Sequence, residues 1–112
     1  GKDVFVFNTK LGSTNVDKIT DFNVIDDTIH LENAIFTKLT SSTFNSITKV
    51  LNTANFVSNT TGKAVDANDY LIYNKTDGKL FYDADGSGTG AAIQFATLNT
   101  NLLLTNADFT VI

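Results

Sequence analysis

Residues 83–88 read Asp-Ala-Asp-Gly-Ser-Gly and carry the clearest metal-binding chemistry in the sequence. Carboxylates at alternate positions before a glycine supply the oxygen ligands that a hard cation such as calcium prefers. The stretch is not an EF-hand loop, because such a loop needs a third acid and a Glu at the position where this chain has Gln94. We therefore interpret Asp83 and Asp85 as candidate calcium ligands. An ordinary acidic turn between two strands is the alternative.

Other patterns that could support catalysis or zinc binding are incomplete. His30 is the single histidine, so a pair of zinc-binding histidines cannot form. The chain has no Gly-x-Ser-x-Gly sequence to present a nucleophilic serine. Asp26 and Asp27 are adjacent, which is more typical of a solvated turn than of two catalytic carboxylates. We therefore expect a protein that is not an enzyme.

The composition favours strands and turns over helices. Eleven of the twelve acids are Asp, all eight basic residues are Lys, and Thr and Asn together number thirty. Asp, Asn and Thr compete with the helix backbone for hydrogen bonds. A net charge of −4 without arginine argues against a nucleic-acid partner, and no apolar run is long enough for a membrane span. Without cysteine the chain can form neither disulfides nor zinc thiolate sites.

The length of 112 residues indicates one domain, 1–112, and local patterns place its elements. The pair Asp77-Gly78 predicts a hairpin turn, and the strand after it continues into an antiparallel meander. The apolar spacing over 32–51 is partly helical, so we expect one or two short helical turns there. A short turn is expected over 105–108. Strands are expected over 4–7, 16–22, 28–31, 70–73, 79–82, 91–96 and 109–112.

The first residues, Gly1-Lys2-Asp3-Val4-Phe5, resemble the second half of the calcium-binding nonapeptide Gly-Gly-x-Gly-x-Asp-x-apolar-x of parallel β-rolls. In such a repeat, glycines let the turn backbone aim carbonyl groups at the ion, and one aspartate per turn adds charge. The match places Asp3 at the carboxylate ligand position. A charged approach to an ordinary strand is the alternative.

The order of the later segments resembles the region that follows the calcium repeats in RTX (hemolysin-type) proteins. The resemblance implies that 1–8 form the last turn of a parallel β-roll and that 9–112 form an antiparallel β-rich capping and secretion segment. It also implies calcium as cofactor, with Asp3 as a ligand, while Asp83 and Asp85 remain candidate ligands on the basis of their own acidic loop. The chain departs from the family in having no complete nonapeptide, so a calcium site shared between turns would be incomplete. The segments that carry the resemblance are 3–7, 16–22, 27–31, 70–74, 80–88 and 91–96.

The last five residues combine one acid with a β-forming apolar tail: Asp108, Phe109, Thr110, Val111 and Ile112. This tail resembles the C-termini of secreted metalloproteases of the RTX group, which act in type I secretion while unfolded. A strand that finishes the sheet is the alternative, and both can hold because export precedes folding in that pathway.

Two functions are expected from these patterns. The first is a non-catalytic C-terminal cap of a calcium-binding RTX β-roll, which supports folding and type I secretion of a larger bacterial protein found outside the cell or on its surface. Its partners would be the upstream β-roll of the same polypeptide and the type I secretion machinery. The alternative is an extracellular adhesin-type module that binds glycan or a cell-surface partner. Clustering of Tyr70, Tyr73 and Tyr82 on one exposed face would favour that alternative, and their burial would remove its main support.

Overall fold

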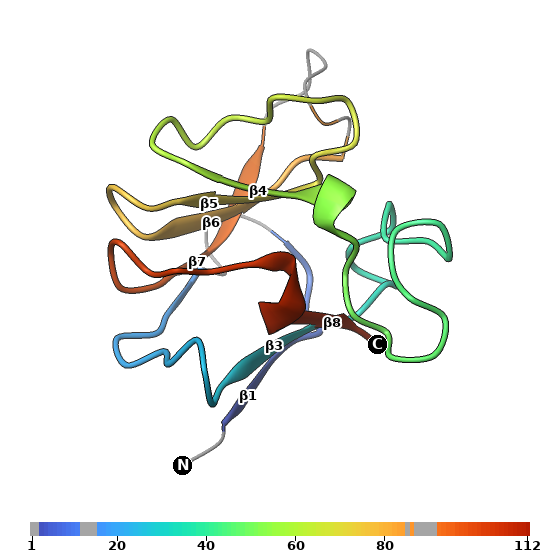
Figure 1. Ribbon diagram of the computed structural model, residues 1–112, viewed down its shortest axis with the longest axis horizontal. Helices are drawn as coiled ribbons and strands as arrows, with labels where there is room; N and C mark the ends of the chain where they lie inside the picture. The colour runs from blue at the N-terminus through green and yellow to red at the C-terminus, as the bar shows by residue number, and fades with distance from the viewer. Residues whose placement is uncertain (1–2, 12–15, 85, 87–91) are drawn as a thin grey trace.

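The computed structural model describes residues 3–11, 16–84, 86 and 92–112, and it shows a mainly β protein built from two sheets (Figure 1). This confirms the β-rich class expected from the composition. Sheet A consists of three parallel strands, in the order β1 (Val4–Phe7), β3 (Thr28–Leu31) and β8 (Phe109–Val111). Sheet B has five strands, in the order β2 (Asp17–Lys18), β7 (Ile93–Thr97), β6 (Lys79–Tyr82), β5 (Leu71–Asn74) and β4 (Phe56–Asn59).

The first three strands form one coil that passes between the sheets. The chain runs through β1 in sheet A, crosses to β2 in sheet B, and returns to sheet A as β3. On its return β3 lies parallel to β1, with Val4 opposite Thr28. Ile29 and Leu31 are fully buried while Thr28 and His30 are half-buried, as the alternation in the sequence predicts for a strand with one face on the core.

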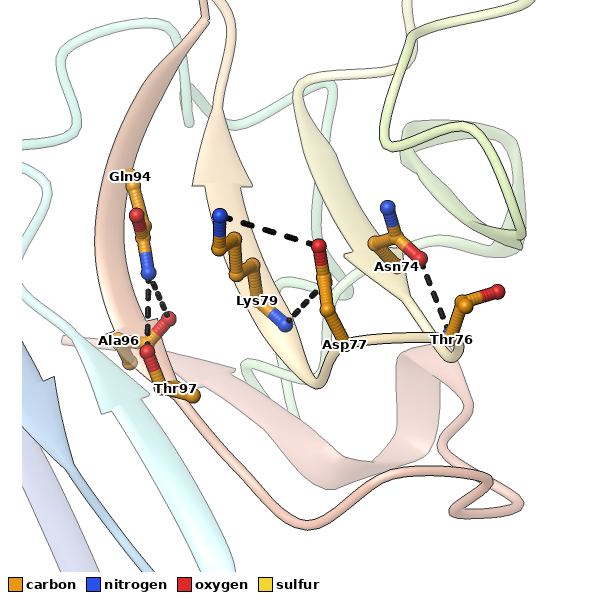
Figure 2. A network of polar contacts seen from close by, with 7 residues as sticks. All are labelled: Asn74, Thr76, Asp77, Lys79, Gln94, Ala96 and Thr97. Atoms are coloured by element: carbon orange, nitrogen blue, oxygen red, sulfur yellow. Dashed lines mark hydrogen bonds and ion pairs between the residues drawn. The ribbon is translucent and has the colours of Figure 1, made fainter.

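The hairpin between β5 and β6 forms where the sequence predicts it. Gly78 has a φ of +80°, which glycine adopts without steric cost, and its N–H donates to the Asn74 carbonyl at 2.7 Å. Figure 2 shows the polar contacts around this turn, in which Asp77 Oδ1 accepts the N–H of Lys79 at 3.1 Å. Asn74 Oδ1 accepts the N–H of Thr76 at 3.0 Å. Side-chain oxygens therefore satisfy backbone groups that the tight turn leaves unpaired.

A bulge in β7 directs the side chain of Phe95 into the core. The register between β6 and β7 shifts between Leu80 and Phe81, and Phe95 is left without a partner on β6. Figure 2 shows Gln94 reaching along its own strand, where its Nε2 donates to Thr97 Oγ1 at 2.9 Å. Because a bulge re-aims the side chains of its strand, Phe95 becomes almost fully buried.

The ring of Phe95 lies at the centre of the contact between the two sheets. It meets the ring of Phe7 on β1 edge to face, with centroids 5.1 Å apart, and the ring of Phe36 at the same distance. Phe36 in turn packs edge to face against Tyr82 on β6, also at 5.1 Å. Such pairs add to the stability gained from burial alone. The aromatic chain therefore ties β1 to the middle of sheet B.

The segment 32–51 contains no continuous helix, but it has short helical turns as expected: the N–H of Phe36 donates to the Glu32 carbonyl at 3.0 Å and that of Lys49 to the Asn45 carbonyl at 2.7 Å. It forms hydrogen-bonded turns, and these bring Phe36 and Leu39 to the same inner side, which accounts for the partly helical spacing of its apolar residues. The N–H of Lys38 donates to the Tyr82 hydroxyl at 2.9 Å and fastens the segment to sheet B. The two 3-10 helices lie outside this segment and are single turns, η1 (Thr53–Asn55) and η2 (Asn106–Asp108).

The strand expected over 16–22 is also shorter than predicted. Only β2 pairs with a neighbour, and its ladder ends where the N–H of Ile19 donates to the Thr97 carbonyl at 2.8 Å. The chain then turns so that both Ile19 and Phe22 enter the core. Across the described part of the chain, no helix has the length and apolar character needed to cross a membrane.

Candidate docking edge

Among the described residues, β1 is an outer strand of sheet A and one of its edges is unpaired. The carbonyl of Asp3, just before β1, accepts the N–H of Thr28 at 2.9 Å, so the backbone groups of alternate residues face β3. The N–H and C=O groups of Val4 and Val6 therefore point to the opposite edge. In the described part of the chain neither residue finds a hydrogen-bond partner on that side. An unpaired row of donors and acceptors is a template for another strand.

The side chains of β1 are apolar on both faces of sheet A. Phe5 and Phe7 point toward the core, while Val4 and Val6 are 54 % and 46 % exposed. Strands of parallel sheets that are covered on both faces read as continuous apolar runs rather than as an alternation. β1 therefore combines an apolar outer face, formed by Val4 and Val6, with an open edge.

The open edge of β2 borders the same hollow as the open edge of β1. Because the N–H of Ile19 faces β7, the backbone groups of Lys18 point away from sheet B. β1 and residues 17–19 together line a hollow of about 390 Å³. A strand pair that approached this end of the molecule would therefore meet the edge of sheet A and the edge of sheet B together.

The opposite edge of sheet A is closed by the chain itself. A short segment, 49–51, runs antiparallel along β8 and bridges it at Val50 and Thr110. The N–H of Leu51 donates to the carbonyl of Phe109 at 3.1 Å, and Lys49 accepts from the N–H of Val111 at 2.8 Å. As far as the structure describes the chain, sheet A is thus open on the β1 side and closed on the β8 side.

Asp27 links the start of β1 to the turn before β3. Its Oδ1 accepts the N–H of Asp3 and its Oδ2 accepts the N–H of Asn23, each at 2.9 Å. The hydrogen bond from Asn23 lowers the pKa of the Asp27 carboxyl most, and the hydrogen bond from Asp3 lowers it further, although burial acts in the opposite direction. Asp3 itself is exposed, and in the described chain its carboxylate has no hydrogen-bond partner.

Two of the three predicted calcium ligands, Asp3 and Asp83, lie within the described residues. Asp83 is buried, its N–H donates to the Tyr70 carbonyl at 2.9 Å, and its own carbonyl accepts from Gly86 at 3.2 Å. Asp85 lies outside the described residues. Over residues 3–11, 16–84, 86 and 92–112, no group of three or more His, Asp or Glu side chains could hold a metal ion. Calcium binding by Asp3, Asp83 and Asp85 therefore stays a prediction.

The five residues of the predicted secretion tail are folded into the domain. Asp108 closes η2 through a capping box, in which its Oδ2 accepts the N–H of Thr105 at 2.9 Å. Burial raises the pKa of the Asp108 carboxyl, with the hydrogen bond from Thr105 acting in the opposite direction. Phe109, Thr110 and Val111 form β8, and Ile112 donates its N–H to the Leu31 carbonyl at 2.9 Å.

The three tyrosines do not form an exposed aromatic face. Tyr73 is fully buried, Tyr82 nearly so, and Tyr70 is half-buried. The Tyr73 hydroxyl donates to the Asn99 carbonyl at 2.5 Å, and burial raises the pKa of that hydroxyl. The clustering that would have favoured glycan binding is therefore not found, and the alternative function loses its main support.

The sequence reasoning did not single out the edges of β1 and β2. β1 stands out in the sequence by its unbroken run of four apolar residues, which is typical of a strand covered on both faces but does not predict an open edge. Nothing comparable marks β2, which is polar, exposed and only two residues long. No family model, no curated protein and no solved structure matches this chain significantly, so its function is inferred from the geometry of the two open edges.

Proposed function

We propose that the chain is a non-catalytic cap of a calcium-binding β-roll of the RTX type, and that the roll docks on β1 and β2. The asymmetry of sheet A carries this proposal, because its β1 edge is open while its β8 edge is closed by 49–51. A parallel strand from a preceding coil would satisfy the free N–H and C=O groups of Val4 and Val6. The closed side would present no edge for a further strand.

The path of the first coil supports docking on both sheets together. β1, β2 and β3 already pass from sheet A to sheet B and back. A preceding coil that followed the same path would place one strand beside β1 and another beside β2, and both edges border one hollow. The open ends of a repeat protein expose apolar interior and need a terminal unit to keep them soluble.

Calcium would act in the glycine turns of the preceding coils. Inside the cell, where free calcium is scarce, the carboxylates of those turns would repel one another and keep the roll unfolded for export. Outside the cell, bound calcium would neutralise them and couple ion binding to folding. The tail 108–112 would be read by a type I secretion system before folding, since η2 and β8 hold these residues once the domain has formed.

Amide hydrogen exchange at β1 tests the proposal directly. Consensus nonapeptide repeats are fused in frame before Gly1, and exchange is measured in calcium and in chelator. In the chain alone, at a concentration low enough to keep it monomeric, we expect the Val4 and Val6 amides to exchange rapidly, because they face an open edge. In the fusion with calcium we expect slowing of about tenfold or more, which corresponds to one net hydrogen bond per amide.

Chelator provides the internal control for this experiment, since it should return both amides to their rates in the chain alone. The proposal is wrong if Val4 and Val6 exchange equally fast in the calcium-loaded fusion and in the unfused chain.

A further inference from the structure

The contact between Asp27 and Asp3 is a contact between two successive strands of sheet A. Val4 lies opposite Thr28, so the residues that precede the two strands, Asp3 and Asp27, occupy equivalent positions. The Asp27 carboxylate accepts the N–H of Asp3 at 2.9 Å, and thus reaches back from one strand to the start of the strand before it. The second oxygen of Asp27 holds the N–H of Asn23 in its own turn.

Both strands share the order Asp-x-apolar-x-apolar, as Asp3–Phe7 and as Asp27–Leu31. Their aspartates differ in burial and in hydrogen bonding. Asp27 is buried and its carboxylate is satisfied, whereas the Asp3 carboxylate is exposed and has no hydrogen-bond partner in the described part of the chain. The strand that would lie before β1, and would offer Asp3 the same kind of donor, is the strand that the open edge can accept.

We infer that the Asp3 carboxylate is the acceptor for the backbone N–H that opens the docked strand of the preceding coil. This inference rests on the proposed docking of a coil at β1. The proposed hydrogen bond would join Asp3 to the coil before β1 in the same way that the Asp27 carboxylate joins β3 to β1. The partner is therefore a parallel β-strand whose opening residue carries an N–H, and a proline at that position would be rejected.

The role assigned to Asp3 differs from that of a calcium ligand in a measurable way. An amide oxygen can accept one N–H, so Asp3→Asn keeps the acceptor that the docked strand needs. The same change removes a negative charge, so a calcium site that used Asp3 would bind the ion more weakly. Asp3→Ala removes both. Because the Asp3 side chain is exposed and makes no hydrogen bond in the described chain, neither substitution should disturb the domain itself.

The experiment compares the repeat fusion carrying Asp3, Asp3→Asn or Asp3→Ala in saturating calcium. The exchange rate of the amide that opens the docked strand reports the proposed bond, and the calcium midpoint of ordering reports the ion. We expect Asp3→Ala to accelerate that amide by about tenfold to a hundredfold, as for loss of a charged acceptor. We expect Asp3→Asn to stay within about threefold of the parent, with an unchanged calcium midpoint.

The outcomes separate this inference from the proposed function. If the Val4 and Val6 amides stay unprotected in the parent fusion, docking itself does not occur and both ideas fall. If they are protected and Asp3→Ala leaves the opening amide unchanged, only the role of Asp3 is refuted. Equal loss in Asp3→Asn and Asp3→Ala, with a raised calcium midpoint in both, would instead make Asp3 a calcium ligand and overturn the inference.

Discussion

Two buried aspartates show how backbone donors decide the charge of a carboxyl group. Asp27 receives two backbone N–H bonds, and these outweigh its burial and lower its pKa. Asp108 receives a single backbone N–H bond, from Thr105, and burial raises its pKa. The charged form is therefore favoured by folding at Asp27 and disfavoured at Asp108.

Replacing Asp27 should reduce the loss of stability in acid. Because the folded pKa of Asp27 is lowered, its contribution is present above its ordinary value of 3.8 and is lost as pH falls through the folded pKa. Asp27→Asn removes this titration and one acceptor. We expect the variant to be less stable than the parent at pH 7 and to lose less free energy of unfolding between pH 5 and about pH 2. Urea unfolding followed by circular dichroism over that range measures both effects.

The neighbouring carboxyl provides a matched control. Asp26→Asn makes the same change of charge one residue away, where no hydrogen bond to the carboxylate is found in the described chain. Its acid profile should follow that of the parent. Identical profiles for both variants would show that the bonds to Asp3 and Asn23 do not set the titration of Asp27.

At the scale of elements, the sequence predicted those turns and strands whose conformation is set by contacts between neighbouring residues. The Asp77-Gly78 turn and the alternation of β3 follow from residues that are neighbours in sequence. Local patterns indicated the short turns of segment 32–51 but not its position, because the segment is fastened by a distant partner, the Tyr82 hydroxyl. The open edges that form the candidate site were missed for a related reason, since an edge is defined by which distant strands do not pair with it.

The β5–β6 hairpin should depend strongly on Gly78. A Cβ at this position would lie 2.0 Å from the carbonyl oxygen of Leu98, and the residue has a φ of +80°. Gly78→Ala therefore combines left-handed strain with a backbone clash, and we expect it to lower the free energy of unfolding by about 2 kcal/mol or more. Urea unfolding measures the loss.

Gly62→Ala is the control for this prediction. Gly62 also has a positive φ, +70°, but the nearest atoms to its added Cβ are side-chain atoms of Asn74 and Phe81 at 3.1 Å. Side chains can shift by a few tenths of an ångström, so we expect a loss nearer to about 1 kcal/mol. Equal losses in the two variants would show that the approach of Leu98 adds nothing to the cost of the backbone conformation.

At the scale of the whole molecule, the unpaired side of β1 should make the isolated chain self-associate. Two copies can pair their β1 strands through Val4 and Val6, whose side chains are 54 % and 46 % exposed. We expect a concentration-dependent dimer in sedimentation velocity. Val6→Lys should abolish it, because a charged residue on an edge strand opposes pairing.

A second valine tests whether position, rather than charge, matters for this dimer. Val65→Lys adds the same charge at a residue that is 67 % exposed and lies outside every strand, so the dimer should persist. Dimers that disappear equally in both variants would point to a general charge effect and not to β1.

The segment 49–51 has a consequence for stoichiometry. The segment covers the β8 edge of sheet A. A copy that pairs with another copy through β1 therefore has no free edge of sheet A with which to bind a third copy. Growth along sheet A therefore ends at a symmetric pair instead of lengthening into a fibril. In the proposed array of coils the same feature would act as a terminator, because no further coil could add beyond β8.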